Sequence, residues 1–231
     1  MDDTTPTHGA AADWTRTLTA RTAAALVVTL ALAAGCWIIS VGQMYGMNMG
    51  VATRLGSFAF FVTVWVPMMA AMMLPGAALA VVRRARANDG LRAAPAFVIA
   101  YVGVWTVVGV GAYWLYRPHG TVAAGVLVIS AGVYELTPLK QACRRRCHQS
   151  TRSGLGFGLC CVGSSIGLML VLLALGVMSV FWMVVITVIT VAQKLLPSRG
   201  AIDVPLALAI VGFGALIIAA PAHIPGLMPS M

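Results

Sequence analysis

The sequence predicts an all-α fold, a polytopic membrane bundle of about seven transmembrane helices. Of the 231 residues, 60% are hydrophobic and only 9% are charged, whereas soluble domains are about a quarter charged. The charges stand in short clusters between long apolar runs, which is how a lipid bilayer sorts them. A bilayer core of about 30 Å requires about 20 helical residues for each crossing. Because lipid offers no partner for unpaired backbone groups, these crossings must be helices.

Seven apolar segments are long enough to cross. Residues 153–193 carry no charge and are too long for one crossing, so we divide them near Gly176. Charged residues bound the segments, in chain order Arg21, Arg83, Arg117, Lys140, Arg152, Lys194 and Asp203. The predicted spans are 22–41, 57–82, 94–116, 120–139, 154–175, 178–194 and 204–221. They form one transmembrane domain over 22–221, between a mobile polar N-terminal tail, 1–21, and a short C-terminal tail, 222–231.

The basic residues predict the orientation of these spans. With the N-terminus in the cytoplasm, 13 of the 15 lysines and arginines fall on the inner side, and only Arg54 and Arg117 fall outside. Cytoplasmic loops are the ones enriched in lysine and arginine. We therefore expect a cytoplasmic N-terminus and an outside C-terminus.

Glu135 is the acidic residue that falls well inside a predicted span. An ionisable group in that position is costly and is usually functional or paired. One interpretation is a metal ligand, and the other is an ion pair with Lys140, Lys194 or a nearby arginine. Pro138 interrupts the helix just after it, which leaves the carbonyl of residue 134 without its usual donor. Tyr134, Thr137 or a bound ion could compensate.

Soft donor atoms gather at the predicted inner side. Cys143 and Cys147 lie in the predicted loop 140–153, and Cys160 and Cys161 lie about two turns into the fifth span. The second span adds four methionines, Met68, Met69, Met72 and Met73. Thiolates and thioethers suit Cu(I) better than they suit oxygen-seeking ions, although methionines in membrane helices often only pack. The pattern indicates a soft-metal site.

A second group of soft donors falls on the predicted outer side: Met44, Met47, Met49, His119 and His223. It could receive copper from outside, or consist of loop residues without common geometry. The fifth span also carries two pairs of glycines four apart, Gly154/Gly158 and Gly163/Gly167, which predict a closely packed central helix. With no histidine inside a span and no Walker, GxSxG or HExxH motif, intramembrane bis-histidine haem, nucleotide and hydrolase chemistry are disfavoured.

Four stretches together resemble a known family: WVPMMAAMMLPG (65–76), AGVYELTPLKQACRRRC (131–147), CVGSSIGLML (161–170) and GVMSVFWMVVITVITVAQKLLP (176–197). The chain is similar to bacterial integral membrane proteins described as predicted metal-binding, a domain of unknown function. The likeness covers roughly residues 55–200. It implies a multi-span bundle whose cysteines and methionines handle a transition metal, above all copper.

The chain departs from that family at three places. Where the family reads Cys-x-Gly-Cys-Cys-Trp, this chain has Cys161 followed by Ser164, Ser165 and Ile166. Gln193 stands where the family usually has glutamate, and Glu135 where it usually has glutamine. We infer that these two positions face each other and that the pocket needs one carboxylate. The lost cysteines imply a diverged paralogue that pairs with a fuller version.

We therefore expect a multi-pass protein of the bacterial cytoplasmic membrane that handles a soft transition metal, most of all copper, by binding it. Its expected partners are the lipid bilayer and a second membrane subunit (a paralogue) or a metalloenzyme that it serves, and not nucleic acid. Two other interpretations stay open: a subunit of a membrane-bound copper-dependent oxygenase or oxidase, and a non-metal structural subunit of a heteromeric complex. Whether the chain is an enzyme is left open. The expected metal ligands are Glu135, Cys143, Cys147 and Cys161, with Met72 and Met73 as thioether donors.

Overall fold

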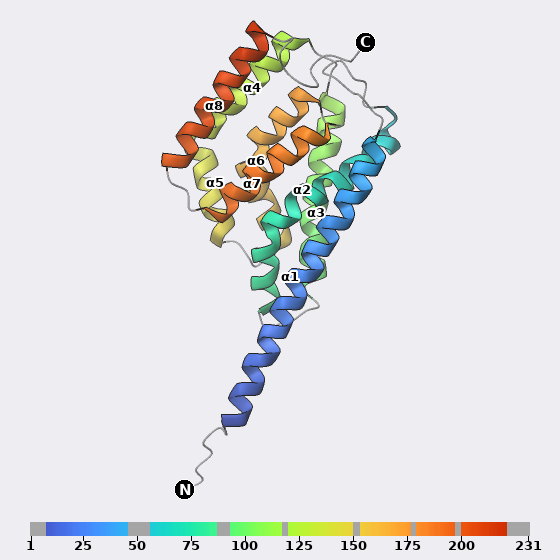
Figure 1. Cartoon of the computed structure of the whole chain (residues 1–231), viewed down its shortest axis with the longest axis vertical. Helices are drawn as coiled ribbons and strands as arrows, with labels where there is room; N and C mark the ends of the chain where they lie inside the picture. The colour runs from blue at the N-terminus through green and yellow to red at the C-terminus, as the bar shows by residue number, and fades with distance from the viewer. Residues whose placement is uncertain are drawn as a thin grey trace.

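The computed structural model describes residues 8–45, 56–86, 93–116, 120–149, 153–176, 179–196 and 200–220. Over these ranges all regular secondary structure is helical, which confirms the predicted all-α class (Figure 1). The helices are α1 (His8–Met44), α2 (Phe58–Arg86), α3 (Ala93–Leu115), α4 (Thr121–Glu135), α5 (Pro138–Gln149), α6 (Gly154–Leu175), α7 (Val180–Leu195) and α8 (Gly200–Ala219).

Six of the seven predicted spans each fall on one helix, whereas the fourth, 120–139, covers α4 and crosses a break into the start of the additional helix α5. The prediction of a loop over 140–153 was wrong for most of that segment, because Pro138–Gln149 is helical. Four helices of the described chain are long and apolar enough to cross a membrane: Ala20–Met44 of α1, α2, α3 and α6. Taken as one bent span, α4 and α5 make a fifth, while α7 and Asp203–Ala219 are shorter apolar helices. The count of seven and the sides of the two termini stay predictions.

The two predicted tails meet the structure differently. The first helix begins at His8, so most of the segment expected as a polar N-terminal tail continues the first apolar helix. Residues 1–7 and the predicted C-terminal tail lie outside the described residues.

The arrangement places α2 and α6 at the centre. Figure 1 shows α1 along one side of the bundle, extending beyond it, and the α4–α8 pair on the other side. α1 packs on α2, α4 packs on α8, and α6 contacts α3, α4, α5 and α7. Large buried side chains fill the interior, including Phe61, Trp65, Tyr101, Trp105 and Leu168. Helices α3 to α8 each contribute at least one side chain to the polar groups described below.

Glycines allow α6 to take this central position. A Cβ at Gly158 would lie 2.9 Å from Val104 of α3, and one at Gly163 would lie 2.6 Å from the sulfur of Cys143 on α5. A Cβ at Gly167 would lie 3.1 Å from Glu135. Such distances leave no room for a side chain, so the glycines let α6 approach its neighbours closely. The predicted close-packed central helix is confirmed.

The break between α4 and α5 follows from Pro138. Proline has no backbone N–H to donate, so the two helices meet at an angle of 64°. Thr137 compensates at the break, because its hydroxyl donates to the carbonyl oxygen of Tyr134 over 2.7 Å and its N–H donates there over 3.0 Å. The sequence predicted that Tyr134, Thr137 or a bound ion would compensate for the donor that Pro138 lacks, and the structure shows that Thr137 does so.

Candidate metal-handling site

The short helix α5 turns basic side chains inward. Lys140 and Arg144 are four residues apart and so share one face of a helix. They are only 2% and 4% exposed, whereas Arg145 and Arg146 face outward. Burying a cation requires a paired anion, and each of these two side chains has one.

Lys140 belongs to a buried three-residue network. Its ammonium is paired with the carboxylate of Glu135 and donates to the amide oxygen of Gln193 over 3.3 Å. The amide nitrogen of Gln193 donates to the same Glu135 oxygen, Oε2, over 2.9 Å. The exposed fraction is 1% for Glu135 and 5% for Gln193. This arrangement confirms that the positions of Glu135 and Gln193 face each other.

Of the two interpretations of Glu135, the structure shows the ion pair, and its partner is Lys140. The interpretation as a metal ligand stays a prediction. The second oxygen, Oε1, is buried beside Gly167 and has no hydrogen-bond partner among the described atoms.

Arg144 is held by α8 and by the end of α7. Its guanidinium donates to the carboxylate of Asp203 over 2.5 Å and to the carbonyl oxygen of Leu196 over 2.9 Å. Both ionic side chains are at least nine-tenths buried. The pair fixes α5 against α8, and it leaves the guanidinium Nε buried without a partner within the described part of the chain.

Cys161 lies at the centre of a second polar cluster. The Lys194 ammonium donates to its sulfur over 2.9 Å, and the Tyr101 hydroxyl lies 3.1 Å from it. The same hydroxyl donates to the backbone carbonyl of Met73 over 3.4 Å, which links α2 to the cluster. Cys161 itself is fully buried. Its sulfur is therefore in contact with polar groups from two other helices, α3 and α7.

Cys147 lies close to this cluster, and Ser164 links it to the backbone of Cys161. Its sulfur is 4.0 Å from the Ser164 hydroxyl, which in turn donates to the Cys161 carbonyl over 2.9 Å. Ser164 is a position at which the resemblance led us to expect cysteine. Cys143, the third expected thiol ligand, packs instead against Gly163.

The expected ligands thus fall into separate groups. The Cys147 sulfur and the Cys161 backbone both contact the Ser164 hydroxyl, and Met72 and Met73 are fully buried on α2. Glu135 is bonded to Lys140 and Gln193. Among the described residues, no three His, Cys, Asp or Glu side chains lie close enough to hold a metal ion by themselves.

The outer group of soft donors is described only at Met44. That side chain is 4% exposed at the end of α1. The other four members, Met47, Met49, His119 and His223, lie outside the described residues.

Two residues of the buried polar networks, Tyr101 and Asp203, were not predicted from the sequence. Tyr101 sits among apolar residues of a predicted span, and Asp203 was seen only as a residue just before the last span. Their partners are 60 and 59 residues away, respectively. A tyrosine on an otherwise apolar helix carries a hydroxyl that needs a partner when buried, and this was the available signal for Tyr101.

Comparison with known proteins yields one match. No curated protein and no solved structure matches the chain. A family model described as PpoB2, copper chaperone, matches residues 62–217. The matched range is more than half of the chain and contains both polar networks, from Met73 to Asp203. It agrees with the resemblance to a metal-related family. The chain belongs to the PpoB2 copper chaperone family.

Proposed function

We propose that this protein is a multi-pass membrane copper chaperone that holds Cu(I) between Cys147 and Cys161 and passes it on. The single observation that carries the proposal is the Cys161 thiol, which is fully buried yet contacts Lys194 and Tyr101. A polar group that deep in an apolar bundle is costly without a purpose. Membership of a copper chaperone family supports copper as the cargo.

The donor chemistry fits this cargo. Thiolates are soft ligands that suit Cu(I), and the Lys194 ammonium offsets the negative charge that a thiolate brings into the bundle. Cys147 on α5 brings a second sulfur to 4.0 Å from the Ser164 hydroxyl, which itself donates to the Cys161 carbonyl. Met73, joined to Tyr101 through its carbonyl, and its neighbour Met72 are the candidates for a thioether ligand.

Glu135 has a different part in this proposal from the ligand role first expected. Its carboxylate is occupied by Lys140 and Gln193. Gln193 is the residue before Lys194 on α7, so the network fixes the helix that carries the ammonium. Glu135 then acts as a positioning residue for Lys194.

Release proceeds by exchange of ligands, with copper remaining Cu(I) throughout. The acceptor we propose is a second membrane subunit or a membrane metalloenzyme of the bacterial cytoplasmic membrane, reached from the inner side, where the basic residues of α5 would lie. The apolar composition and the long apolar helices support the membrane location.

The test is the copper content of detergent-purified protein from copper-supplemented cells. We expect about one copper per chain in the wild type and a loss of most of it in the Cys147→Ser/Cys161→Ser variant. Cys36→Ser is the matched control, because Cys36 lies on α1 and outside both polar networks. Full retention of copper in the double variant would refute the site. A folded wild-type protein without copper would instead favour the structural-subunit interpretation, in which the buried ion pairs only hold the helices.

A further inference from the structure

A cavity of about 210 Å³ opens between α2, α5, α6 and α7, and Cys147 lines it. Ser164 and Lys194 also line it, and the apolar walls come from Leu79, Ala80 and Phe157. Arg83, another lining residue, is exposed. The cavity thus brings an exposed cation and one of the thiols that we propose as copper ligands into the same space.

The charged side chains that line this cavity are all cationic among the described residues. They are Arg83, Arg144 and Lys194. Asp203 pairs with Arg144 from outside the lining and offsets one of these charges. A recess lined by charges of one sign concentrates ligands of the opposite sign.

Arg144, which lines the cavity, also has a buried donor without a partner among the described residues. Arg144 is 4% exposed, and its Nε has no hydrogen-bond partner among the described residues. Buried N–H groups are nearly always paired, so an acceptor is wanted here. Guanidinium groups pair with carboxylates through paired, charge-assisted hydrogen bonds.

The arginines and the thiol of this cavity suit a ligand that has carboxylate groups and also a soft donor atom. The volume equals that of about seven water molecules at about 30 Å³ each, which suits a small organic acid whose remainder extends past Arg83. The carboxylates would meet the arginines, while the soft atom would lie toward Cys147.

We propose that this cavity binds the small carboxylate-bearing thiol that delivers Cu(I) to the protein, an inference that rests on the proposed function. Arg83 and Arg144 hold the carboxylates. The Cys147 thiol then exchanges with the carrier: a copper–sulfur bond forms at Cys147, the bond to the carrier sulfur breaks, and the Cys147 proton goes to that sulfur. Copper stays Cu(I), and no electron moves.

The test begins without copper. Mercaptosuccinate, a thiol with two carboxylates, is titrated by calorimetry into the detergent-purified full chain, with the neutral thiol thioglycerol as the comparison probe. We expect mercaptosuccinate to bind and thioglycerol to show at least tenfold weaker binding. Arg83→Gln should weaken the binding of mercaptosuccinate about fivefold, the size expected for one partly exposed charge contact.

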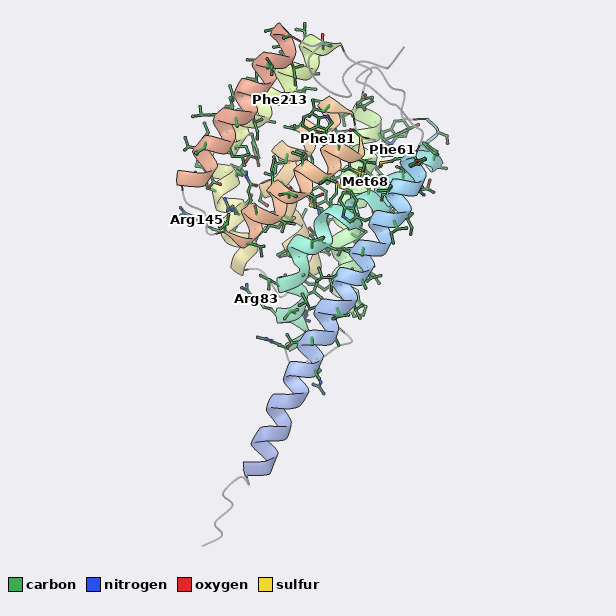
Figure 2. The ribbon with its side chains drawn as sticks, in the orientation of Figure 1. Phe61, Met68, Arg83, Arg145, Phe181 and Phe213 are labelled. Atoms are coloured by element: carbon green, nitrogen blue, oxygen red, sulfur yellow. The ribbon has the colours of Figure 1, made fainter. Side chains whose placement is uncertain are left out.

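Arg145→Gln is the matched control. It removes the same charge from the exposed side of α5, and Arg145 does not line the cavity. Figure 2 labels Arg83 and Arg145, which lie on different helices, α2 and α5. We expect this variant to bind mercaptosuccinate like the wild type. Equal weakening by both variants would mean a general effect of surface charge and would overturn the proposal.

Anionic lipid headgroups present a similar chemistry and form a separate arm. The titration is repeated in nanodiscs of phosphatidylcholine with and without phosphatidylglycerol. Unchanged affinity supports the soluble carrier, whereas loss of mercaptosuccinate binding with phosphatidylglycerol would assign the cavity to lipid and overturn the proposal.

A final arm measures copper transfer from the Cu(I) complexes of both thiols. Arg83→Gln should slow transfer from mercaptosuccinate about fivefold and leave transfer from thioglycerol unchanged, and equal slowing of both would count against the proposal. If the purified protein retains copper but mercaptosuccinate does not bind, only this inference fails. If mercaptosuccinate binds but copper is not retained, the proposed function fails and the anion site alone remains.

Discussion

The pocket around Lys140 is built for one carboxylate, and adding a second should destabilise the fold. In Gln193→Glu, a carboxylate replaces the amide that donates to Glu135 over 2.9 Å. At an effective dielectric constant of about 20, two charges at that distance repel by about 6 kcal/mol. Lys140, 3.3 Å from the side-chain oxygen of Gln193, returns about 5 kcal/mol of attraction. The desolvation of a second buried ion, several kcal/mol, then decides the sign.

The expected net loss in the free energy of unfolding is about 3–5 kcal/mol. For a chain of this size each kcal/mol lowers the melting temperature by about 2–4 °C, so Gln193→Glu should melt about 10 °C lower. The assay is thermal unfolding in detergent, followed by tryptophan fluorescence. Glu135→Gln alone should cost a similar amount, because it leaves the Lys140 ammonium buried without an anion.

The double variant Glu135→Gln/Gln193→Glu is the decisive control. It exchanges the two side chains and keeps one carboxylate, one amide and one ammonium in the pocket. We expect its stability to lie within about 1 kcal/mol of the wild type, so that the two changes are strongly non-additive. If the double variant instead loses the sum of the two single losses, the reasoning about this pocket is refuted.

Three further predictions concern the packing around the site, each read as a melting temperature in detergent. Gly163→Ala places a Cβ 2.6 Å from the Cys143 sulfur and should lower the free energy of unfolding by about 1–3 kcal/mol. Adding Cys143→Ala should recover most of that loss. If stability is not recovered, the clash lies elsewhere. Asp203→Asn leaves the buried guanidinium of Arg144 without its anion. The free energy of unfolding should fall by about 3–5 kcal/mol, whereas a loss below about 1 kcal/mol would show that the pair is solvated. Thr137→Val removes the hydroxyl donor at the α4–α5 break and should cost about 1 kcal/mol, with faster amide exchange in α5 than in α4; uniform exchange would contradict the capping role.

The helices could be predicted because an apolar run that crosses lipid must be helical. Six of the predicted segments each fall on one helix, and 120–139 falls on α4 and the start of α5. The glycines of α6 were equally informative, since spacing by four places them on one face. The span count was harder to read, because α7 and the apolar part of α8 are short.

The reach of α5 into the bundle could not be read from the sequence. A segment rich in arginine normally remains in water, and nothing in its order shows that Lys140 and Arg144 are buried while Arg145 is exposed. The partner that buries Arg144 is 59 residues away. Long-range pairing of this kind follows from packing, which local pattern does not reveal.

The candidate site was predicted in part. The facing positions of Glu135 and Gln193 were inferred from an exchange of carboxylate and amide between this chain and its family, and the structure confirms the contact. The same reasoning placed Glu135 among the thiols, whereas the structure gives it Lys140 as its partner. Spacing shows which residues share a helix face, but not which of two nearby partners each side chain chooses.

The most direct test of copper handling is X-ray absorption at the copper edge on Cu(I)-loaded, detergent-purified protein. The account predicts a first shell dominated by sulfur, with sulfur neighbours lost in the Cys147→Ser/Cys161→Ser variant and kept in Cys36→Ser. A first shell of nitrogen and oxygen alone, unchanged by the double variant, would contradict it.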